Sequence, residues 1–500
     1  DPEIINIISY QTAQQYQIIP LSKREKFLTI AMADPLDVFA MDDIRALTGY
    51  KIIPLIATAS DIANTIDKYY GSQEEGEINT VLDNISEDQI ELVEKQKEET
   101  LDTGALLQLS QEAPVIKITN MILEDAIKMK ASDVLIEPFE KKMRVRLRID
   151  GILKERESPP KALHPSIISR IKVISNLNIA EHRLPQDGRF KIKIEGKQVD
   201  FRVSILPSSF GEKVALRILD KTTAMLNVEK LGFGDYSLNL IKKNALRPHG
   251  MILVTGPTGS GKTTTLYSIL KFIDRPQRNI ITVEDPVEYQ IEGINQVSIR
   301  PDIGLTFASS LRSILRQDPD IVMVGEIRDF DTADIAIKAA LTGHLVLSTL
   351  HTTTAPASIA RLVNMGVEPF LITSSLICVV TQRLIRLICV KCKESYKLTT
   401  ESLDKLKIKH AKDKPLVFYR GKGCSFCSNS GYKGRTSIAE VLVLVPEIKD
   451  LIMEKAQDYK IKKVARSLGM KTLRESGMEK VFAGVSTLEE VLKITAADES

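Results

Sequence analysis

The chain has 500 residues, of which 43% are hydrophobic and 5% aromatic, and its formal net charge is +3. A chain of this length can bury several hydrophobic cores, so three or four domains are expected. The best candidate for a membrane segment covers residues 371–380, but it is short and interrupted by Thr373, Ser374 and Ser375. Because a spanning helix needs roughly 20 apolar residues, a membrane span is excluded here and a buried core helix is predicted instead.

Residues 1–70 are predicted to form a small α/β module without catalytic character. The apolar runs at residues 27–31 and 50–56 predict two strands. Helices are expected over residues 34–47 and 60–70, the second capped by Ser60. Since nothing in the module carries chemistry, we interpret it as a docking part.

Residues 71–112 are acidic and poor in aromatic side chains. Residues 71–113 hold twelve acidic side chains against two lysines, a local charge of −10, so the rest of the chain carries about +13. Such a segment cannot bury enough apolar surface to offset its conformational entropy, and it is predicted to be a flexible linker with some helix near residues 88–96. The basic remainder suits acidic proteins, anionic lipid or nucleic acid, although solvated lysine and arginine faces are the commoner explanation.

Residues 113–228 are predicted to form an α+β domain. Val115, Ile118, Ile122 and Ala126 have helical spacing and predict a helix over residues 115–128. Short alternating strands are expected at residues 143–148, 190–194, 199–204 and 214–218. A further domain is predicted over residues 229–500, with a helical part from about residue 437 to the end.

The most informative stretch, residues 251–266, reads MILVTGPTGSGKTTTL. A short apolar run meets the pattern G-x-x-x-x-G-K-T, which predicts a strand, a phosphate loop and a helix. Bare glycine backbone lets several N–H groups hold the phosphates of ATP, while Lys262 can reach the β- and γ-phosphates and the Thr263 hydroxyl can coordinate Mg²⁺. The alternative is a chance glycine-rich turn. The predicted nucleotide-binding residues of the loop are Gly256, Pro257, Thr258, Gly259, Ser260, Gly261, Lys262, Thr263 and Thr264.

Two further predicted strands end in carboxylates. Residues 280–288 read IITVEDPVE and carry Glu284, Asp285 and Glu288, at the strand end where open α/β sheets bind ligands. One carboxylate could polarise the attacking water and another could hold the Mg²⁺ shell; a solvated acidic turn is the alternative. Residues 321–328, IVMVGEIR, are similar to a Walker B strand with Gly-Glu in place of the usual Asp. Glu326 would reach Mg²⁺ through a water.

Two histidines, His344 and His351, flank the apolar run at residues 345–347. A lone histidine is usually structural or exposed, but two at the ends of one predicted core strand indicate more. His344 is predicted to contact the γ-phosphate or the catalytic water.

Four cysteines form two C-x-x-C pairs, Cys389 with Cys392 and Cys424 with Cys427. Two such pairs suit tetrahedral thiolate ligation of zinc, although thirty-one residues between them exceed the usual separation. Disulfides or redox thiols are the alternative. The lack of a secretion signal together with a nucleotide site indicates a reducing compartment, so structural Zn²⁺ is predicted. Cys378 is predicted to pack in the buried core helix.

Taken together, these motifs resemble the secretion ATPase superfamily of type II secretion and type IV pilus assembly, the GspE/PilB family. The resemblance spans essentially the whole chain. It implies an α/β multidomain protein with a RecA-like P-loop ATPase core at residues 229–500, a zinc element at about 386–436, and a PAS-like α+β N-terminal domain at 113–228. Beside the motifs above, it rests on ASDVLIEP (131–138), RVRLRIDGIL (144–153), RLPQDGR (183–189), FRVSILPSSFGEKVALRIL (201–219) and GYKGRTSIAEVL (431–442).

The resemblance assigns roles to single residues as well. Glu284, Asp285 and Glu288 match the family's Asp box, with Glu284 and Asp285 as cofactor-binding residues and Glu288 as the general base. Glu326 matches the Walker B carboxylate. The two histidines named above match the His box.

Two arginines outside the ATPase core, Arg202 and Arg217, match residues of the PAS-like domain that approach the γ-phosphate when the two domains close. Such arginines can contribute roughly 10³–10⁵ in rate. The sequence alone would favour surface ion pairs for both. One departure from the family pattern is Leu135, which stands where relatives often have histidine.

The resemblance implies a homohexameric ATPase motor that uses ATP, Mg²⁺ and Zn²⁺. It would be cytoplasmic and peripheral at the inner membrane, held there indirectly by the platform and cytoplasmic assembly proteins of a pilus or secretion machine. The upstream cyclic-di-GMP motif of some relatives is absent from residues 1–70, so that ligand is not predicted.

Three rival functions stay open. A pilus retraction motor would lack the zinc element and the extended N-terminal module. A nucleic-acid translocase would want a basic channel with interleaved aromatic residues, and no nucleic-acid partner is expected here. A non-enzymatic nucleotide-binding scaffold fits least, because Lys262, Thr263, Glu288 and Glu326 are all present.

Overall fold

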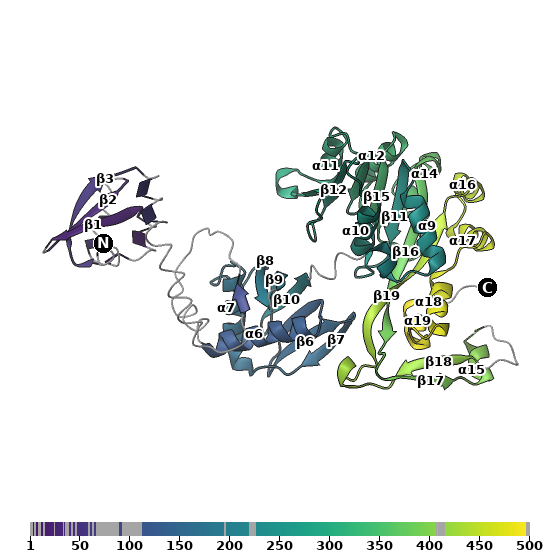
Figure 1. Cartoon of the computed structure of the whole chain (residues 1–500), viewed down its shortest axis with the longest axis horizontal. Coiled ribbons are helices and arrows are strands. Elements are labelled where there is room, and N and C mark those ends of the chain that lie inside the picture. Colours follow the sequence, from purple (N-terminus) through teal and green to yellow (C-terminus); the bar gives the residue numbers. More distant parts are fainter. Residues whose placement is uncertain are drawn as a thin grey trace. The chain divides into compact units, whose positions relative to one another are not determined.

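The computed structural model divides the chain into two compact units, Asp1–Gln89 and Ile90–Ser500 (Figure 1). Each unit has a hydrophobic core of its own. The structure describes residues 113–194, 197–219, 227–406, 408, 416–496 and 90–92, and parts of residues 4–66.

The first unit contains a three-stranded sheet made of β1 (Ile18–Arg24), β2 (Phe27–Met32) and β3 (Lys51–Ile56), in that order. β1 is antiparallel to β2, and β2 is parallel to β3. The two predicted strands are confirmed. β1 was missed because a bulge between Pro20 and Ser22 interrupts its alternation. Most of the two predicted helices lies outside the described residues.

The second unit begins with a seven-stranded antiparallel sheet in the order β4-β8-β9-β10-β5-β6-β7. Inward and outward side chains alternate, as in β6, because successive residues of a strand point to opposite faces. Two helices, α6 (Ala113–Lys128) and α7 (His164–Ile174), supply residues to the same core. The strands are β4 (Ile90–Leu92), β5 (Asp133–Pro138), β6 (Met143–Ile149), β7 (Ile152–Arg156), β8 (Gln186–Ile194), β9 (Lys197–Ser208) and β10 (Gly211–Leu219).

The edge strand β4 corrects one prediction. Helix was expected near residues 88–96, but Ile90–Leu92 pairs antiparallel with β8. The partner strand is about one hundred residues away in sequence, and local propensity does not report such a partner.

A second seven-stranded sheet follows, in the order β13-β12-β14-β15-β11-β16-β19. All neighbours are parallel except β16 and β19. Four central strands are buried along their whole length, which explains their continuous apolar sequences. The strands are β11 (Gly250–Thr255), β12 (Ile280–Glu284), β13 (Asn295–Ser298), β14 (Ile321–Val324), β15 (Leu345–Leu350), β16 (Leu376–Ile388) and β19 (Tyr432–Val443).

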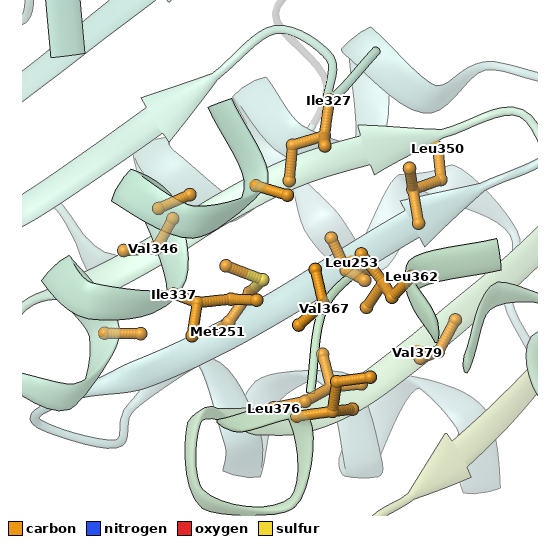
Figure 2. Packing of buried hydrophobic residues seen from close by; sticks show 14 of the residues in the cluster. Met251, Leu253, Ile327, Ile337, Val346, Leu350, Leu362, Val367, Leu376 and Val379 are labelled. Atoms are coloured by element: carbon orange, nitrogen blue, oxygen red, sulfur yellow. The ribbon is translucent and has the colours of Figure 1, made fainter. Parts of the chain in front are cut away.

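Helices cover both faces of this sheet. Ile252 and Val254 of β11 pack with α9 (Asp235–Ala245) and α10 (Lys262–Ile273). Met251 and Leu253 point to the opposite face, where Figure 2 shows them beside side chains such as Ile337. That face is covered by α11 (Phe307–Ile314), α12 (Phe330–Leu341), α13 (Ala355–Asn364), α14 (Pro369–Ser375), α16 (Pro446–Met453) and α17 (Asp458–Ser467).

The core helix predicted at residues 371–380 is confirmed for residues 371–375 and wrong for residues 376–380. α14 ends at Ser375, and the chain continues as β16 between β11 and β19. A short apolar run fits a buried helix or a buried strand equally well, and β-branched residues such as Ile377 and Val379 favour the strand. Cys378 is buried as predicted, but it lies in this strand.

The remaining part surrounds a two-stranded antiparallel sheet of β17 (Lys393–Lys397) and β18 (Val417–Gly421). α15 (Thr400–Lys405) follows β17, and α18 (Leu473–Phe482) and α19 (Leu488–Ile494) close a small core with Phe418 at 0% exposure. Over the described residues, no helix combines the length and apolar character that crossing a bilayer requires.

Candidate nucleotide and metal sites

The loop between β11 and α10 has the backbone that a phosphate site requires. Gly256 has φ 144°, and a Cβ atom there would lie 2.6 Å from the carbonyl oxygen of Gln382. Gly261, which caps α10, has φ 89°. Only glycine adopts such conformations readily. The predicted loop residues therefore gather at the carboxyl end of β11, where the first turn of α10 presents free N–H groups to anions.

Lys262 folds back over this loop. Its Nζ donates hydrogen bonds to the carbonyl oxygens of Gly256, at 2.9 Å, and Pro257, at 3.2 Å. Burial lowers the pKa of Lys262, the carboxylate of Glu326 opposes that shift, and Arg383 adds to it. The ammonium group thus lies within reach of phosphate oxygens bound in the loop, which would replace the two neutral carbonyls.

Gln382 of β16 holds the loop in place, and the sequence analysis missed it. The side chain is fully buried. Its Nε2 donates to the carbonyl oxygen of Ser260 at 2.7 Å, and its Oε1 accepts from the Thr265 hydroxyl at 2.9 Å. The sequence signal was weak: a polar pair, Thr381-Gln382, inside an apolar strand.

The structure brings Arg202 and Glu288 together. A guanidinium nitrogen of Arg202 lies 2.9 Å from Oε2 of Glu288, and Nη2 donates to the carbonyl oxygen of Val287 at 3.0 Å. Arg217 is opposite Arg202 in the register of β9 and β10, but its guanidinium pairs with Asp133 at 3.2 Å. We call the segment after β12 that carries Asp285 and Glu288 the carboxylate loop. Of the two predicted arginines, only Arg202 contacts this loop.

Arg328 links carboxylates from two neighbouring strands. It lies 3.2 Å from Oδ2 of Asp285, after β12, and it donates to Glu326, after β14. The hydrogen bond to Glu326 is the main reason that the pKa of Arg328 is raised. Nε2 of His351, after β15, lies 3.4 Å from Oε2 of Glu326. These four side chains meet because parallel strands end at the same edge of the sheet.

Glu284 takes a different position from the other carboxylates. It is only 3% exposed, and its carboxyl group accepts hydrogen bonds from Tyr267, Thr282 and Gln296. The structure therefore places Glu284 beneath the carboxylate loop, whereas Asp285 and Glu288 lie on it.

The structure does not bring His344 to the phosphate loop. His344 precedes β15, and its carbonyl oxygen accepts from the N–H of Gly250 at the start of β11. The loop lies at the other end of β11, about 20 Å away at 3.3 Å per strand residue. Nδ1 of His344 lies 2.9 Å from the carbonyl oxygen of Ala339. Contact of His344 with a γ-phosphate on the same chain does not fit this position; His351 is at the correct end.

The four paired cysteines converge as the sequence predicted. Their sulfur atoms all lie within 4.8 Å of one another, and the separations include 3.8 Å for Cys389–Cys424, 3.8 Å for Cys392–Cys427 and 3.7 Å for Cys424–Cys427. A tetrahedron with Zn–S bonds of 2.3 Å has edges of about 3.8 Å, so the donor set fits zinc. None of the four forms a disulfide.

Backbone groups favour a thiolate at one of the four sulfurs, that of Cys427, whereas burial raises the pKa of Cys392 to about 12. The N–H groups of Cys424 and Gly431 donate to the Cys427 sulfur at 3.2 and 3.3 Å. Burial would raise the pKa of Cys427, but these donors and neighbouring thiols bring it to about 6. Full burial raises the pKa of Cys378 to about 12, so this thiol stays protonated and serves only to pack the core.

Fold and site together define a P-loop nucleotide-binding protein with a mostly parallel sheet and a separate tetracysteine cluster. The chain belongs to the type II/IV secretion system protein family, whose model matches residues 108–493. The MshEN domain model matches residues 1–76. The family resemblance and the fold class predicted from the motifs are confirmed.

Two relatives illustrate the match. The type IV pilus assembly ATPase PilB of Myxococcus xanthus is 46% identical, over 100% of this chain and 88% of the relative. The type II secretion system protein E of Xanthomonas campestris is 44% identical, over 99% and 85%.

Solved structures agree on the fold. The pilus retraction motor PilT with bound ADP is 28% identical, with a TM-score of 0.52, over 75% of this chain and 96% of that one. The ATPase DotB of Legionella pneumophila has a TM-score of 0.56 at 20% identity, over 75% and 95%, and supports the fold alone.

Proposed function

We propose that the chain is an ATP-hydrolysing motor for type IV pilus assembly or type II protein secretion. The observation that carries this proposal is that the phosphate loop and the carboxylates of Asp285, Glu288 and Glu326 lie at the same edge of one sheet, where its parallel strands end. Its relatives named as pilus assembly and secretion ATPases support the wider process. A homohexamer at the cytoplasmic face of the inner membrane, held by platform and assembly proteins, completes the proposal.

Each residue of the site has its own part in ATP hydrolysis. The loop backbone and Lys262 hold the phosphates, and Thr263 with Glu326 would hold Mg²⁺, the latter through a water. When bound, Mg²⁺ neutralises charge on the phosphate oxygens. Glu288 orients the attacking water and accepts its proton. In-line attack of this water on the γ-phosphorus forms a new P–O bond while the bond to the β-phosphate oxygen breaks, which leaves ADP and phosphate.

Arg202 links the two sheets to this chemistry. In the present state it is paired with Glu288. A bound γ-phosphate would offer it a stronger anionic partner and leave Glu288 free to act on water. Closing of the antiparallel-sheet domain on the ATPase core would then accompany each turnover and transmit force.

Structural zinc in the tetracysteine cluster is the second element of the proposal. Four thiolates fill a tetrahedral shell and leave no open position for catalysis. The metal would tie Cys389 and Cys392, after β16, to Cys424 and Cys427, after β18.

The activity is tested by phosphate release from the assembled chain with ATP and magnesium. Wild type should turn over ATP, and Lys262→Ala and Glu288→Gln should each lower kcat by at least about 10²-fold. Wild-type turnover by either variant, or no turnover by the wild type, would contradict the proposal.

The process is tested by capture with the full chain as bait in its native cells. Recovery of only a pilus-platform protein selects pilus assembly, and recovery of only a secretion-platform protein selects secretion. ATPase stimulation by DNA, without either platform, would instead support a nucleic-acid translocase.

A further inference from the structure

Glu284 was expected to bind the nucleotide or its metal, yet its carboxyl group is already occupied. Oε1 accepts from the Thr282 hydroxyl at 2.5 Å and from Nε2 of Gln296 at 3.1 Å. Oε2 accepts from the Tyr267 hydroxyl. With 3% exposure, the group has three donors and little access to water or a metal.

The donors come from three different elements. Tyr267 belongs to α10, which begins at Lys262, and Thr282 belongs to β12. Gln296 belongs to β13. Glu284 itself is the last residue of β12, directly before Asp285. One carboxylate therefore joins the helix of the phosphate loop to the strand that carries the catalytic carboxylates.

Gln296 extends this network along the segment after Glu288. Its Oε1 accepts from the N–H of Ile291 at 2.7 Å, and its Nε2 also donates to the carbonyl oxygen of Tyr289 at 3.2 Å. The Tyr289 ring meets the Tyr267 ring edge-on, with centroids 4.6 Å apart. Both ends of the carboxylate loop are thus fastened to Glu284 and its donors.

A buried carboxyl group is costly unless hydrogen bonds compensate its desolvation. Burial raises the pKa of Glu284, and the three side-chain donors oppose that shift. Loss of one donor would leave a buried acceptor incompletely satisfied. Each donor therefore helps to fix the Glu284 carboxyl group, which belongs to the residue directly before Asp285.

We propose that Glu284, Tyr267 and Gln296 are positioning residues that hold the loop of Asp285 and Glu288 in register with the phosphate loop. This inference rests on the proposed ATPase function. None of the three residues needs to touch the nucleotide or the metal. They act by keeping Glu288 at the distance and angle that its water requires, where a displacement of 1 Å can cost about 10²-fold in rate.

The test compares Tyr267→Phe and Gln296→Met with Tyr459→Phe, a matched loss of a hydroxyl on α17, where the side chain is 54% exposed. We expect both network variants to lower kcat by about 10-fold to 10²-fold while the KM for ATP changes by less than about 2-fold. Tyr459→Phe should match the wild type. Equilibrium binding of ADP and the thermal unfolding midpoint, measured on the same samples, separate positioning from misfolding.

Two results would overturn the inference while the wild type is active. In one, Tyr267→Phe and Gln296→Met keep the kcat of the wild type. In the other, Glu284→Gln raises the magnesium concentration for half-maximal activity and the two donor variants do not, which would make Glu284 a part of the metal shell. A wild type without phosphate release would instead overturn the proposed function itself.

Discussion

At the scale of single residues, Arg202 is the side chain that most directly couples the two sheets. It comes from β9, but it donates a hydrogen bond to the carbonyl oxygen of Val287 and forms an ion pair with Glu288, both after β12. A guanidinium group suits this position because its fork of N–H donors can pair with a carboxylate or with a phosphate.

The corresponding prediction concerns Arg202→Ala. Because the variant loses the cation that would stabilise charge on the transferred phosphoryl group, kcat should fall by about 10³-fold, with nucleotide affinity nearly unchanged. Single-turnover kinetics and ADP binding measure the two quantities. A variant with normal kcat would show that the arginine forms only an ion pair.

Arg217 offers a comparison on the neighbouring strand. It pairs with Asp133 in the present state, so any part in catalysis requires it to leave that carboxylate when the domains close. Arg217→Ala therefore distinguishes a closed state that recruits both arginines from one that uses Arg202 alone.

At the scale of elements, the tetracysteine cluster lies between the end of β16 and the start of β19. Its ligands stand at the ends of a long excursion that contains β17 and β18. The small core around Phe418 contributes some stability to that excursion, but a structural zinc site can contribute on the order of 10 kcal/mol.

We predict one zinc ion per chain in the purified protein. Removal of the metal by a chelator, or replacement in Cys392→Ser, should speed hydrogen exchange in β17 and β18 and leave that in β11 unchanged. Cys378→Ala is the matched control, since that buried thiol lies in β16 away from the cluster, and it should retain full zinc content. Equal zinc content in Cys392→Ser and wild type would refute the site.

At the scale of the whole molecule, the residues assigned to the reaction all belong to the second unit, Ile90–Ser500, between Arg202 and Glu326. The first unit has its own sheet and core and contributes none of them. Chemistry and docking are therefore expected to be separable.

A chain without Asp1–Gln89 should keep ATP turnover within about 3-fold of the full chain, because no proposed catalytic group is removed. Its capture of platform or assembly proteins should be lost. Phosphate release and the capture experiment measure these two outcomes. A drop in turnover of more than about 10²-fold would show that the first unit takes part in assembling the active state.

Much of this molecule follows from local sequence signals. A phosphate loop needs its glycines, its lysine and its threonine in one continuous stretch, so the strand, loop and helix order of residues 250–273 was predictable from the sequence. The same holds for the two C-x-x-C pairs, because a metal shell restricts both the type and the spacing of its ligands. Continuous apolar runs likewise predicted the buried parallel strands.

Other features were decided only by the tertiary structure. The sequence places Glu284 beside Asp285 and His344 before a core strand. It does not show which of these side chains faces the edge of the sheet where the phosphate loop lies. Glu284 is buried and accepts hydrogen bonds from Tyr267 and Gln296. Because β15 runs parallel to β11, His344 lies at the amino ends of the strands, opposite the phosphate loop. The physical reason is that side-chain accessibility depends on neighbours distant in sequence, such as Gln382 at the loop and Arg202 at Glu288, whereas motif chemistry depends on neighbours along the chain.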